Sequence, residues 1–195
     1  MILGSHNSWS YLPPKKWYLK PFKLVAQCQD VDIATQYLTY KVRCFDLRLQ
    51  FDDEGHTKIV HGSMTFDYNW EDVLNDLAFL NIKKDCYVRV IHDVRTESAH
   101  TPLRVSYFQN RCKELLVKFP NIVFWNGRNL YNGEKDYVFK PSTDKITCEE
   151  LYSSVRYPKY LDDWFPRLYA LIMNHKNRKK GTDKDILLID FVNYK

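Results

Sequence analysis

Hydrophobic positions along the chain follow two alternating patterns. Short apolar runs rich in β-branched residues predict strands over residues 42–51, 58–61, 87–94, 121–125 and 186–192. Apolar residues three or four positions apart predict three amphipathic helices. The stripes of these helices are Trp70, Val73, Leu74, Leu77 and Leu80; Phe108, Cys112, Leu115, Leu116 and Phe119; and Trp164, Phe165, Leu168, Tyr169 and Ile172.

The alternation of strands and helices indicates βα units around a mainly parallel sheet. A barrel built from such units carries its chemistry at the carboxyl ends of its strands. A complete eight-fold barrel needs ~200 residues or more, and this chain has 195. We therefore expect an α/β fold that is a compact, irregular or incomplete TIM-like (β/α) barrel. Residues 1–195 contain no internal repeat and no long Gly/Ser linker, which predicts a single domain.

The composition, with 45% hydrophobic and 27% charged residues, is that of a soluble globular protein. The aromatic share of 15% is high, which either an aromatic-rich core or an aromatic rim around a binding cleft explains. A net charge of +5 fits an anionic substrate or surface but is too small to indicate nucleic-acid binding. No apolar run approaches the ~20 residues of a membrane-spanning helix.

The N-terminus and the cysteines favour the cytoplasm. The first residues lack the basic region and the apolar stretch of a signal peptide. Five cysteines without a C-x-x-C pair suggest neither a disulfide framework nor a zinc site. We therefore expect a cytoplasmic protein in a reducing compartment rather than a secreted one.

Two histidines follow short apolar segments. His6 comes directly after the first apolar run and is flanked by small polar residues, so it is either a turn or capping histidine or a functional one. His61 ends the predicted strand 58–61 and precedes Gly62, which lets backbone come close to a ligand. Either histidine alone is a weak signal.

Charged residues interrupt two predicted strands. Asp46 and Arg48 are two positions apart, so they share one face of the strand 42–51. They form either a structural ion pair or a clamp whose arginine presents its fork of donors to a phosphate. Asp190 lies inside the apolar strand 186–192, where a carboxylate needs a hydrogen-bond partner. A histidine that it orients is a natural partner.

Together these residues have the chemistry to cleave a phosphodiester through a neighbouring hydroxyl. That reaction needs a base for the hydroxyl and an acid for the leaving oxygen, and histidine suits both tasks because its pKa lies near neutrality. Arg48 can supply the cation that the phosphate oxygens need, without a metal. A carboxylate behind the base fixes its tautomer and stabilises its charged form.

In their order and spacing, residues 4–8 (GSHNS), 42–48 (VRCFDLR) and 60–62 (VHG) resemble the catalytic X region of phosphatidylinositol-specific phospholipase C. Residues 66–74 resemble the helix that follows in that family, and residues 188–193 look like the final barrel strand of its bacterial members. The resemblance is dense over residues 1 to about 95 and returns at the C-terminus. It implies a distorted, open TIM-like barrel of the phospholipase C-like type.

The resemblance also implies roles for individual residues. His6 resembles the general base, and Asp190 the carboxylate that supports it. His61 resembles the general acid. Arg48 resembles the phosphate-binding arginine that replaces calcium in the metal-independent bacterial enzymes, and Asp46 the acid beside it.

The calcium-dependent branch of that family provides an alternative. Asn7 stands where bacterial members carry an aspartate that assists the general acid, and asparagine there is a feature of the calcium-dependent enzymes. Asp93 lies near a further position of the family's active site, so we expect Asn7, Asp93 and Arg48 to contact substrate. If the protein used calcium, the ligands would be Asn7, Asp46 and Asp93. Because the Arg48 cation should repel calcium, we expect no metal and no other cofactor.

Several other features have two interpretations each. Aromatic and basic residues after His6 either rim the cleft at a lipid surface or pack that loop onto the barrel. They are Trp9, Tyr11, Trp17, Tyr18, Lys15, Lys16 and Lys20. The basic run 174–184 is either a solvated loop or an anion-attracting lip. The remaining histidines show no metal-ligand spacing and are treated as surface or structural residues; they are His56, His92, His100 and His175.

The sequence thus predicts a phosphodiesterase, a phosphorus–oxygen lyase resembling phosphatidylinositol-specific phospholipase C, that cleaves an inositol-type phosphodiester through a cyclic phosphate. The expected partners are a lipid or soluble phosphodiester substrate and an anionic membrane surface. One alternative is a cytosolic phosphodiesterase for a soluble glycerophospho- or nucleotide-like substrate, and another is a protein that binds an anionic ligand without turnover. A metal-dependent glycerophosphodiesterase is disfavoured, because residues 46–48 lack the Glu-x-Asp pair of that chemistry.

Overall fold

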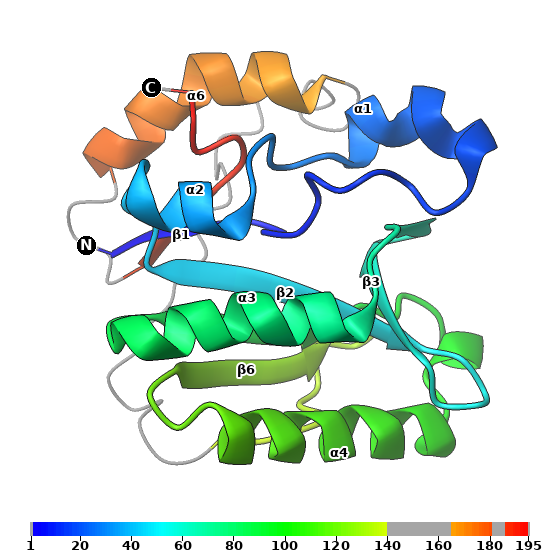
Figure 1. Ribbon diagram of the computed structural model, residues 1–195. Coiled ribbons are helices and arrows are strands. Elements are labelled where there is room, and N and C mark those ends of the chain that lie inside the picture. The colour runs from blue at the N-terminus through cyan, green and yellow to red at the C-terminus, as the bar shows by residue number, and fades with distance from the viewer. Residues whose placement is uncertain (1, 140–164, 181–185, 195) are drawn as a thin grey trace.

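Seven strands form one sheet in the computed structural model, which describes residues 2–139, 165–180 and 186–194 (Figure 1). The strands are β1 (Ile2–Ser5), β2 (Cys44–Phe51), β3 (Thr57–His61), β4 (Met64–Thr65), β5 (Tyr87–His92), β6 (Val123–Asn129) and β7 (Ile186–Ile189). The five predicted strands are confirmed to within a few residues at each end. The hairpin partner β4 was not predicted.

Five of the strands run parallel in the order β7-β1-β2-β5-β6. β3 pairs antiparallel with the last residues of β2, and β4 pairs antiparallel with β3. Within the described ranges the sheet stays open, because β6 and β7 pair along one side only. The carboxyl ends of the parallel strands meet at one edge, which is where an incomplete (β/α) barrel places its site.

The helices follow the strands in the order expected for βα units. They are η1 (Trp17–Phe22), α1 (Lys23–Ala26), α2 (Ile33–Leu38), α3 (Trp70–Lys83), η2 (Glu97–Ala99), α4 (Pro102–Lys118) and α6 (Pro166–Lys180). Local sequence sets the starts of the long helices. Asn69 accepts a hydrogen bond from the backbone N–H of Asp72 at the start of α3, and Thr101 caps α4. None of the helices in the described ranges is long and apolar enough to span a bilayer.

The two faces of the sheet differ in character. Phe45, Leu47 and Leu49 of β2 belong to a large apolar core, which α2, α3 and α4 cover (Figure 1). The alternate residues of β2, among them Asp46 and Arg48, point to the opposite face. The predicted separation of apolar and polar residues within this strand is therefore confirmed, and the sheet carries its charged groups on the face away from those three helices.

Close packing between strands requires a glycine at position 4. Gly4 of β1 lies between β2 and β7, and a Cβ atom there would collide with the side chain of Leu188 and come within 3.1 Å of the Cβ of Cys44. Glycine therefore lets β1 enter the sheet between its two neighbours. This packing brings the residue that follows β1, His6, next to both β2 and β7.

The third predicted helical stripe is only partly correct. α6 buries Tyr169 as expected, but it also buries Ala170, Met173 and Asn174, whereas Phe165, Leu168 and Ile172 are exposed. Trp164 lies outside the described residues, as do Cys148 and residues 181–184 of the basic run.

Candidate active site

His6 follows β1 directly and is held from two sides. Its backbone N–H donates to the carbonyl of Ile189 at 3.0 Å, and its Nδ1 donates to Oδ1 of Asp190 at 2.6 Å. Asp190 comes one residue after the end of β7, so the prediction that it lies inside that strand is off by one position. Its partner is nevertheless the expected histidine. Because Nδ1 carries the proton, Nε2 is the basic nitrogen of the ring.

Arg48 contacts that basic nitrogen. Nη2 of Arg48 donates to Nε2 of His6 at 2.5 Å, and Nε of Arg48 donates to Asp46 at 3.0 Å. A continuous chain of hydrogen bonds therefore runs from Asp190 through His6 and Arg48 to Asp46. The side chain of Arg48 is almost completely buried, so its charge acts in a site with little solvent to screen it.

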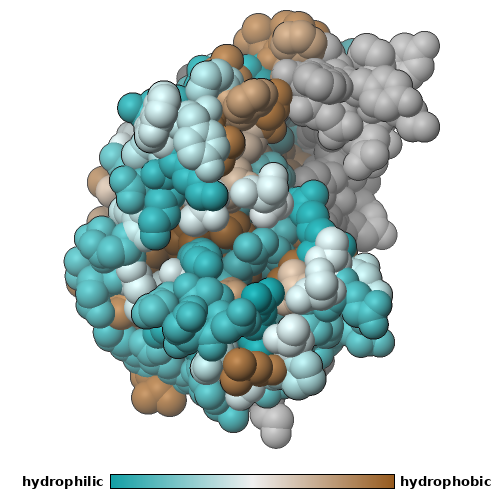
Figure 2. All heavy atoms as spheres, turned by 90° about the vertical axis from the view of Figure 1, so that its right-hand side faces the viewer, coloured by the Kyte–Doolittle hydropathy of each residue, from teal (hydrophilic) through white to brown (hydrophobic). Residues whose placement is uncertain are grey.

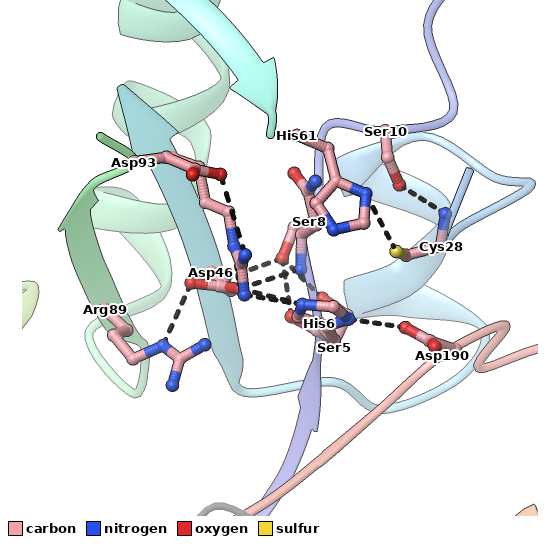
Figure 3. Close-up of polar contacts among 12 residues, drawn as sticks. Ser5, His6, Ser8, Ser10, Cys28, Asp46, His61, Arg89, Asp93 and Asp190 are labelled. Carbon is pink, nitrogen blue, oxygen red and sulfur yellow. Dashed lines mark hydrogen bonds and ion pairs between the residues drawn. The ribbon is translucent and has the colours of Figure 1, made fainter. Parts of the chain in front are cut away.

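Asp46 lies between two guanidinium groups (Figure 3). Its Oδ2 accepts from Arg48 and from the backbone N–H of Asn7, and its Oδ1 accepts from Nε of Arg89 at 2.9 Å. Burial alone would raise the pKa of Asp46, but the two guanidinium groups outweigh it and hold the pKa well below its usual range. Asp46 is therefore an anion at any physiological pH and fixes the position of Arg48.

Arg89 is a site residue that the sequence analysis missed. It is fully buried on β5, and its position pairs with Asp46 across the parallel ladder. A signal was present in the sequence: residue 89 is the one arginine in the apolar run 87–91. A buried arginine there requires an acidic partner, and a strand beside β2 would have suggested Asp46.

His61 stands at the end of β3 and faces His6. The two ring centroids are 5.6 Å apart, with the rings nearly perpendicular (Figure 3). Nδ1 of His61 donates to the carbonyl of Ala26 at 2.8 Å, which makes Nε2 the unprotonated nitrogen of the neutral ring. Burial, and then the positive charge of Arg48, lower the pKa of His61 to about 4. The ring is therefore neutral at physiological pH in the ligand-free protein.

Asp93 and Asn7 complete the polar cluster. Oδ2 of Asp93 lies 3.7 Å from Nη1 of Arg48 and accepts from the backbone N–H of Gly62 at 3.1 Å. Gly62 has a positive φ of 59°, which glycine adopts without strain. Asn7 is completely buried, and within the described residues its Oδ1 has no hydrogen-bond partner. A buried amide oxygen without a partner is a candidate ligand-binding group.

A buried glutamine connects the segments of the site. Nε2 of Gln29 donates to the carbonyls of His6 and Ile189, and its Oε1 accepts from the N–H of Val192 at 3.1 Å. Gln29 thus ties the loop after β1 to the chain on both sides of Asp190. No pattern in the sequence indicates this role, because it depends on the packing of three segments that are distant along the chain.

The structure thus places His6, Asp46, Arg48, His61 and Asp190 in one cluster at the carboxyl end of the parallel strands. Asn7 and Asp93 adjoin it, so all seven residues singled out from the sequence are brought together. The two imidazoles flank the guanidinium, and two carboxylates hold the ends of the chain of hydrogen bonds. The arrangement can bind an anion, and it can move a proton at Nε2 of either histidine. The catalytic roles assigned to these residues stay predictions.

A second histidine–aspartate cluster lies on the opposite face of the sheet. His92 and His100 donate to different oxygens of Asp136 at 2.6 and 2.9 Å, and Asn129 donates to the same carboxylate. His92 is fully buried and its ring stacks on Phe108 of α4 at 4.9 Å. His92 and His100 were expected to be surface or structural residues. His92 is a structural residue, because its ring belongs to the core.

These features define an α/β fold of the phospholipase C-like type, a TIM-like (β/α) barrel that stays open in the described residues, with a histidine–arginine–histidine cluster at its carboxyl edge. No family model matches the chain, and no curated protein does. Solved structures of a phosphatidylinositol-specific phospholipase C from Staphylococcus aureus do match it.

One of these structures, a variant of the Staphylococcus enzyme, superposes with a TM-score of 0.66 at 16% identity and covers 100% of this chain and 87% of that chain. A second variant gives 0.65 at 16% identity, with coverage of 100% and 86%, and a double mutant gives 0.60 at 15% identity over the same shares. At this low identity the likeness establishes the fold. The expected resemblance in architecture is therefore confirmed.

Proposed function

We propose that the protein is a phosphodiesterase that cleaves an inositol-type phosphodiester by attack of a neighbouring hydroxyl, through a cyclic phosphate. The observation that carries the proposal is the chain from Asp190 through His6 to Arg48, with the His61 ring 5.6 Å from the His6 ring. The similarity in fold to phosphatidylinositol-specific phospholipase C supports the class of reaction.

His6 is the proposed general base. Asp190 fixes the proton on Nδ1, so Nε2 is the atom that accepts the proton of the attacking hydroxyl. In the ligand-free protein Arg48 occupies that nitrogen. A bound phosphate attracts the guanidinium more strongly than a neutral imidazole does, so substrate binding turns Arg48 toward phosphate and releases Nε2 of His6. The negative charge of Asp190 then stabilises the imidazolium that forms.

His61 is the proposed general acid, and it needs a proton that the free protein does not hold there. Arg48 is one cause of its lowered pKa, and a phosphate bound between them would neutralise that charge. The pKa of His61 then rises toward neutrality, and the ring can donate a proton to the leaving oxygen. Substrate binding and protonation of the acid are coupled in this scheme.

Arg48 takes the place of a metal ion in this proposal. Its guanidinium stabilises the negative charge that grows on the phosphate oxygens during the reaction. The alternative calcium site of Asn7, Asp46 and Asp93 fits poorly, because both oxygens of Asp46 already accept from guanidinium groups and Asp93 lies beside Arg48. Calcium takes six to eight oxygen ligands, and two cations next to the carboxylates oppose it.

The substrate is proposed to lie at a membrane surface. Trp17, Tyr18, Phe22 and Leu24 of η1 and α1 are each more than half exposed, and Lys15, Lys16 and Lys20 accompany them. Figure 2 shows apolar side chains gathered at the top of the face that looks out from the carboxyl ends of the strands. Such a surface suits the interface of an anionic bilayer. A soluble glycerophospho- or nucleotide-like substrate remains the alternative.

Phosphorus NMR tests the reaction and the substrate together. The protein is incubated with vesicles that contain phosphatidylinositol and, separately, with glycerophosphoinositol and with nucleotide diesters. The proposal predicts a cyclic phosphate signal from the inositol compounds, with vesicles the faster substrate, and none from His6→Ala. Recovery of unchanged diester in every sample, under conditions in which a bound ligand is detected, would identify a binding protein instead.

A further inference from the structure

A buried thiol lies against both histidines of the site. Cys28, two residues after the end of α1, is 3% exposed, and its Sγ is 3.7 Å from Nδ1 of His61. The thiol also interacts with the carboxylate of Asp190, which binds His6. Figure 3 shows the sulfur beside the His61 ring, on the side of the site where Asp190 lies. The proposed reaction has no use for this thiol.

The ligand atoms of these residues converge. One ring nitrogen of His6, Sγ of Cys28 and one ring nitrogen of His61 lie within 4.8 Å of one another. A tetrahedral zinc ion with Zn–S near 2.3 Å and Zn–N near 2.0–2.1 Å separates its sulfur and nitrogen ligands by about 3.6 Å. The distance from Sγ of Cys28 to Nδ1 of His61, 3.7 Å, is close to that value. This nitrogen donates to the Ala26 carbonyl in the metal-free protein, so a bound ion takes the place of that hydrogen bond and leaves the ring proton on Nε2. The carboxylate of Asp190 lies beside this group, with Oδ1 2.6 Å from Nδ1 of His6.

We propose that His6, Cys28 and His61, with Asp190 beside them, form a binding site for zinc or another borderline-soft divalent ion, and that such an ion inhibits the enzyme. Imidazole and thiolate are the ligands that zinc prefers. An ion held by both imidazoles prevents each of them from moving a proton. The binding of the metal does not depend on the proposed function, whereas the inhibition does.

The charges at the site suit a divalent cation. Burial and the neighbouring Asp190 raise the pKa of Cys28 well above its usual value, so without a metal this residue is a thiol and not a nucleophile. A coordinated metal removes the proton, and the thiolate together with Asp190 then balances the two charges of the ion. Arg48 contacts Nε2 of His6, the ring nitrogen that does not face Asp190. The carboxylates of Asp46 and Asp93 offset the positive charge of Arg48.

Cobalt(II) tests the binding site without any substrate. A cobalt–thiolate bond absorbs in the near ultraviolet through charge transfer, so a titration of the chelator-treated protein with cobalt reports directly on a cysteine ligand. We expect this band in the wild type and in Cys86→Ser, whose thiol is buried beside Asp85 at the start of β5 and far from the cluster. The band should be missing in Cys28→Ser and in Cys28→Ala. Its persistence in both Cys28 variants, or its absence from the wild type, would overturn the proposal.

Zinc titrations of the activity test the inhibition. Zinc should inhibit the wild type and Cys86→Ser reversibly, with activity restored by a chelator. Cys28→Ser should retain the basal activity and require at least about tenfold more zinc, because it has lost a ligand. Equal sensitivity of the wild type and Cys28→Ser would contradict an inhibitory role for this site. If no phosphodiester is turned over at all, the cobalt band still decides whether the metal site exists, so the two proposals fail separately.

Discussion

Two histidine–aspartate clusters lie at the same end of the sheet, on opposite faces, and they differ in what surrounds the carboxylates. The inner cluster is the candidate active site, in which His6 stands between Asp190 and Arg48. The nearby Asn7 has an unpaired buried oxygen. The outer cluster is the second group, in which Asp136 accepts hydrogen bonds from His92, His100 and Asn129. The outer carboxylate is thus fully satisfied within the protein. Its His92 is packed in the apolar core, and among the described residues Nε2 of that ring has no hydrogen-bond partner.

The difference shows what makes such a pair a candidate site. A histidine paired with an aspartate is found in both clusters, so the pair alone does not indicate function. The inner cluster adds a buried cation directly at the basic nitrogen and a second imidazole across from it. With this cation and this second imidazole, the inner cluster can bind an anion and can move protons on two sides of the anion. The outer cluster links the ends of β5 and β6 to the loops around them.

Removal of either inner histidine should have the largest effect on activity. His6→Ala and His61→Ala should each lower kcat by about 10²- to 10⁴-fold, because each removes one proton-transfer group. His100→Ala, in the outer cluster, is the matched control and should leave kcat within a factor of about two of the wild type. Steady-state kinetics on phosphatidylinositol vesicles, with circular dichroism to verify the fold, make the comparison. Equal losses in the inner and outer variants would remove the distinction between the two clusters.

Removal of Arg89 should have the largest effect on stability. Arg89→Met leaves one oxygen of the buried Asp46 without its cation, and breaking a buried ion pair in this way lowers the free energy of unfolding by about 3–5 kcal/mol. Arg104→Met breaks the exposed pair with Asp53 and should cost at most about 1 kcal/mol. Urea denaturation measures both values. A small effect at Arg89 would mean that Arg48 alone satisfies Asp46.

Replacement of Arg48 separates its charge from its geometry. Arg48→Ala should lower kcat by about 10²- to 10³-fold, as the loss of a group that stabilises transition-state charge does. Arg48→Lys retains the charge but not the fork of donors, so it should recover only part of that loss. Full activity in the lysine variant would show that a point charge suffices.

The lowered pKa of His61 should make stability depend on pH. The unfolded chain binds the proton near the ordinary histidine pKa of about 6.5, whereas the folded protein binds it only near 4. The unfolded state therefore gains protons first, and the free energy of unfolding falls as the pH drops from about 6.5 to about 4, by on the order of 2–3 kcal/mol. His61→Asn should lack this part of the pH dependence. Parallel pH profiles of the two proteins, measured by urea denaturation, would refute the shift.

The outer cluster should respond in stability alone. Asp136→Asn replaces an acceptor of three hydrogen bonds by an amide that cannot accept them all, which should lower the free energy of unfolding by about 1–3 kcal/mol. Because the network lies on the other face of the sheet, kcat should stay close to the wild-type value. A selective loss of kcat without a loss of stability would assign the outer cluster to the reaction.

The sequence was most informative where local patterns decide the structure. The alternation in β2 correctly separated Asp46 and Arg48 from Phe45, Leu47 and Leu49, because the side-chain period of a strand is fixed. The order of strands and helices indicated the fold class, and the cap of α3, Asn69, directly precedes the stripe that begins at Trp70.

Residues that act through long-range packing were missed. Arg89 is defined by its register against β2, Gln29 by three segments that meet, and Cys28 by its contact with His61. None of these contacts produces a recognisable spacing of residues along the sequence. The apolar stripe of α6 was misjudged for a related reason: which face of a helix is buried depends on the elements beside it.

In the proposed reaction Arg48 supplies the cation of the site, so that two histidines work around a phosphate without a metal ion. The most direct test is turnover of phosphatidylinositol vesicles by protein that has been dialysed against a strong chelator and is assayed in its presence, with metal content measured by mass spectrometry. We expect an unchanged kcat in the metal-free protein. Loss of turnover in the chelator, restored by added calcium, would contradict it.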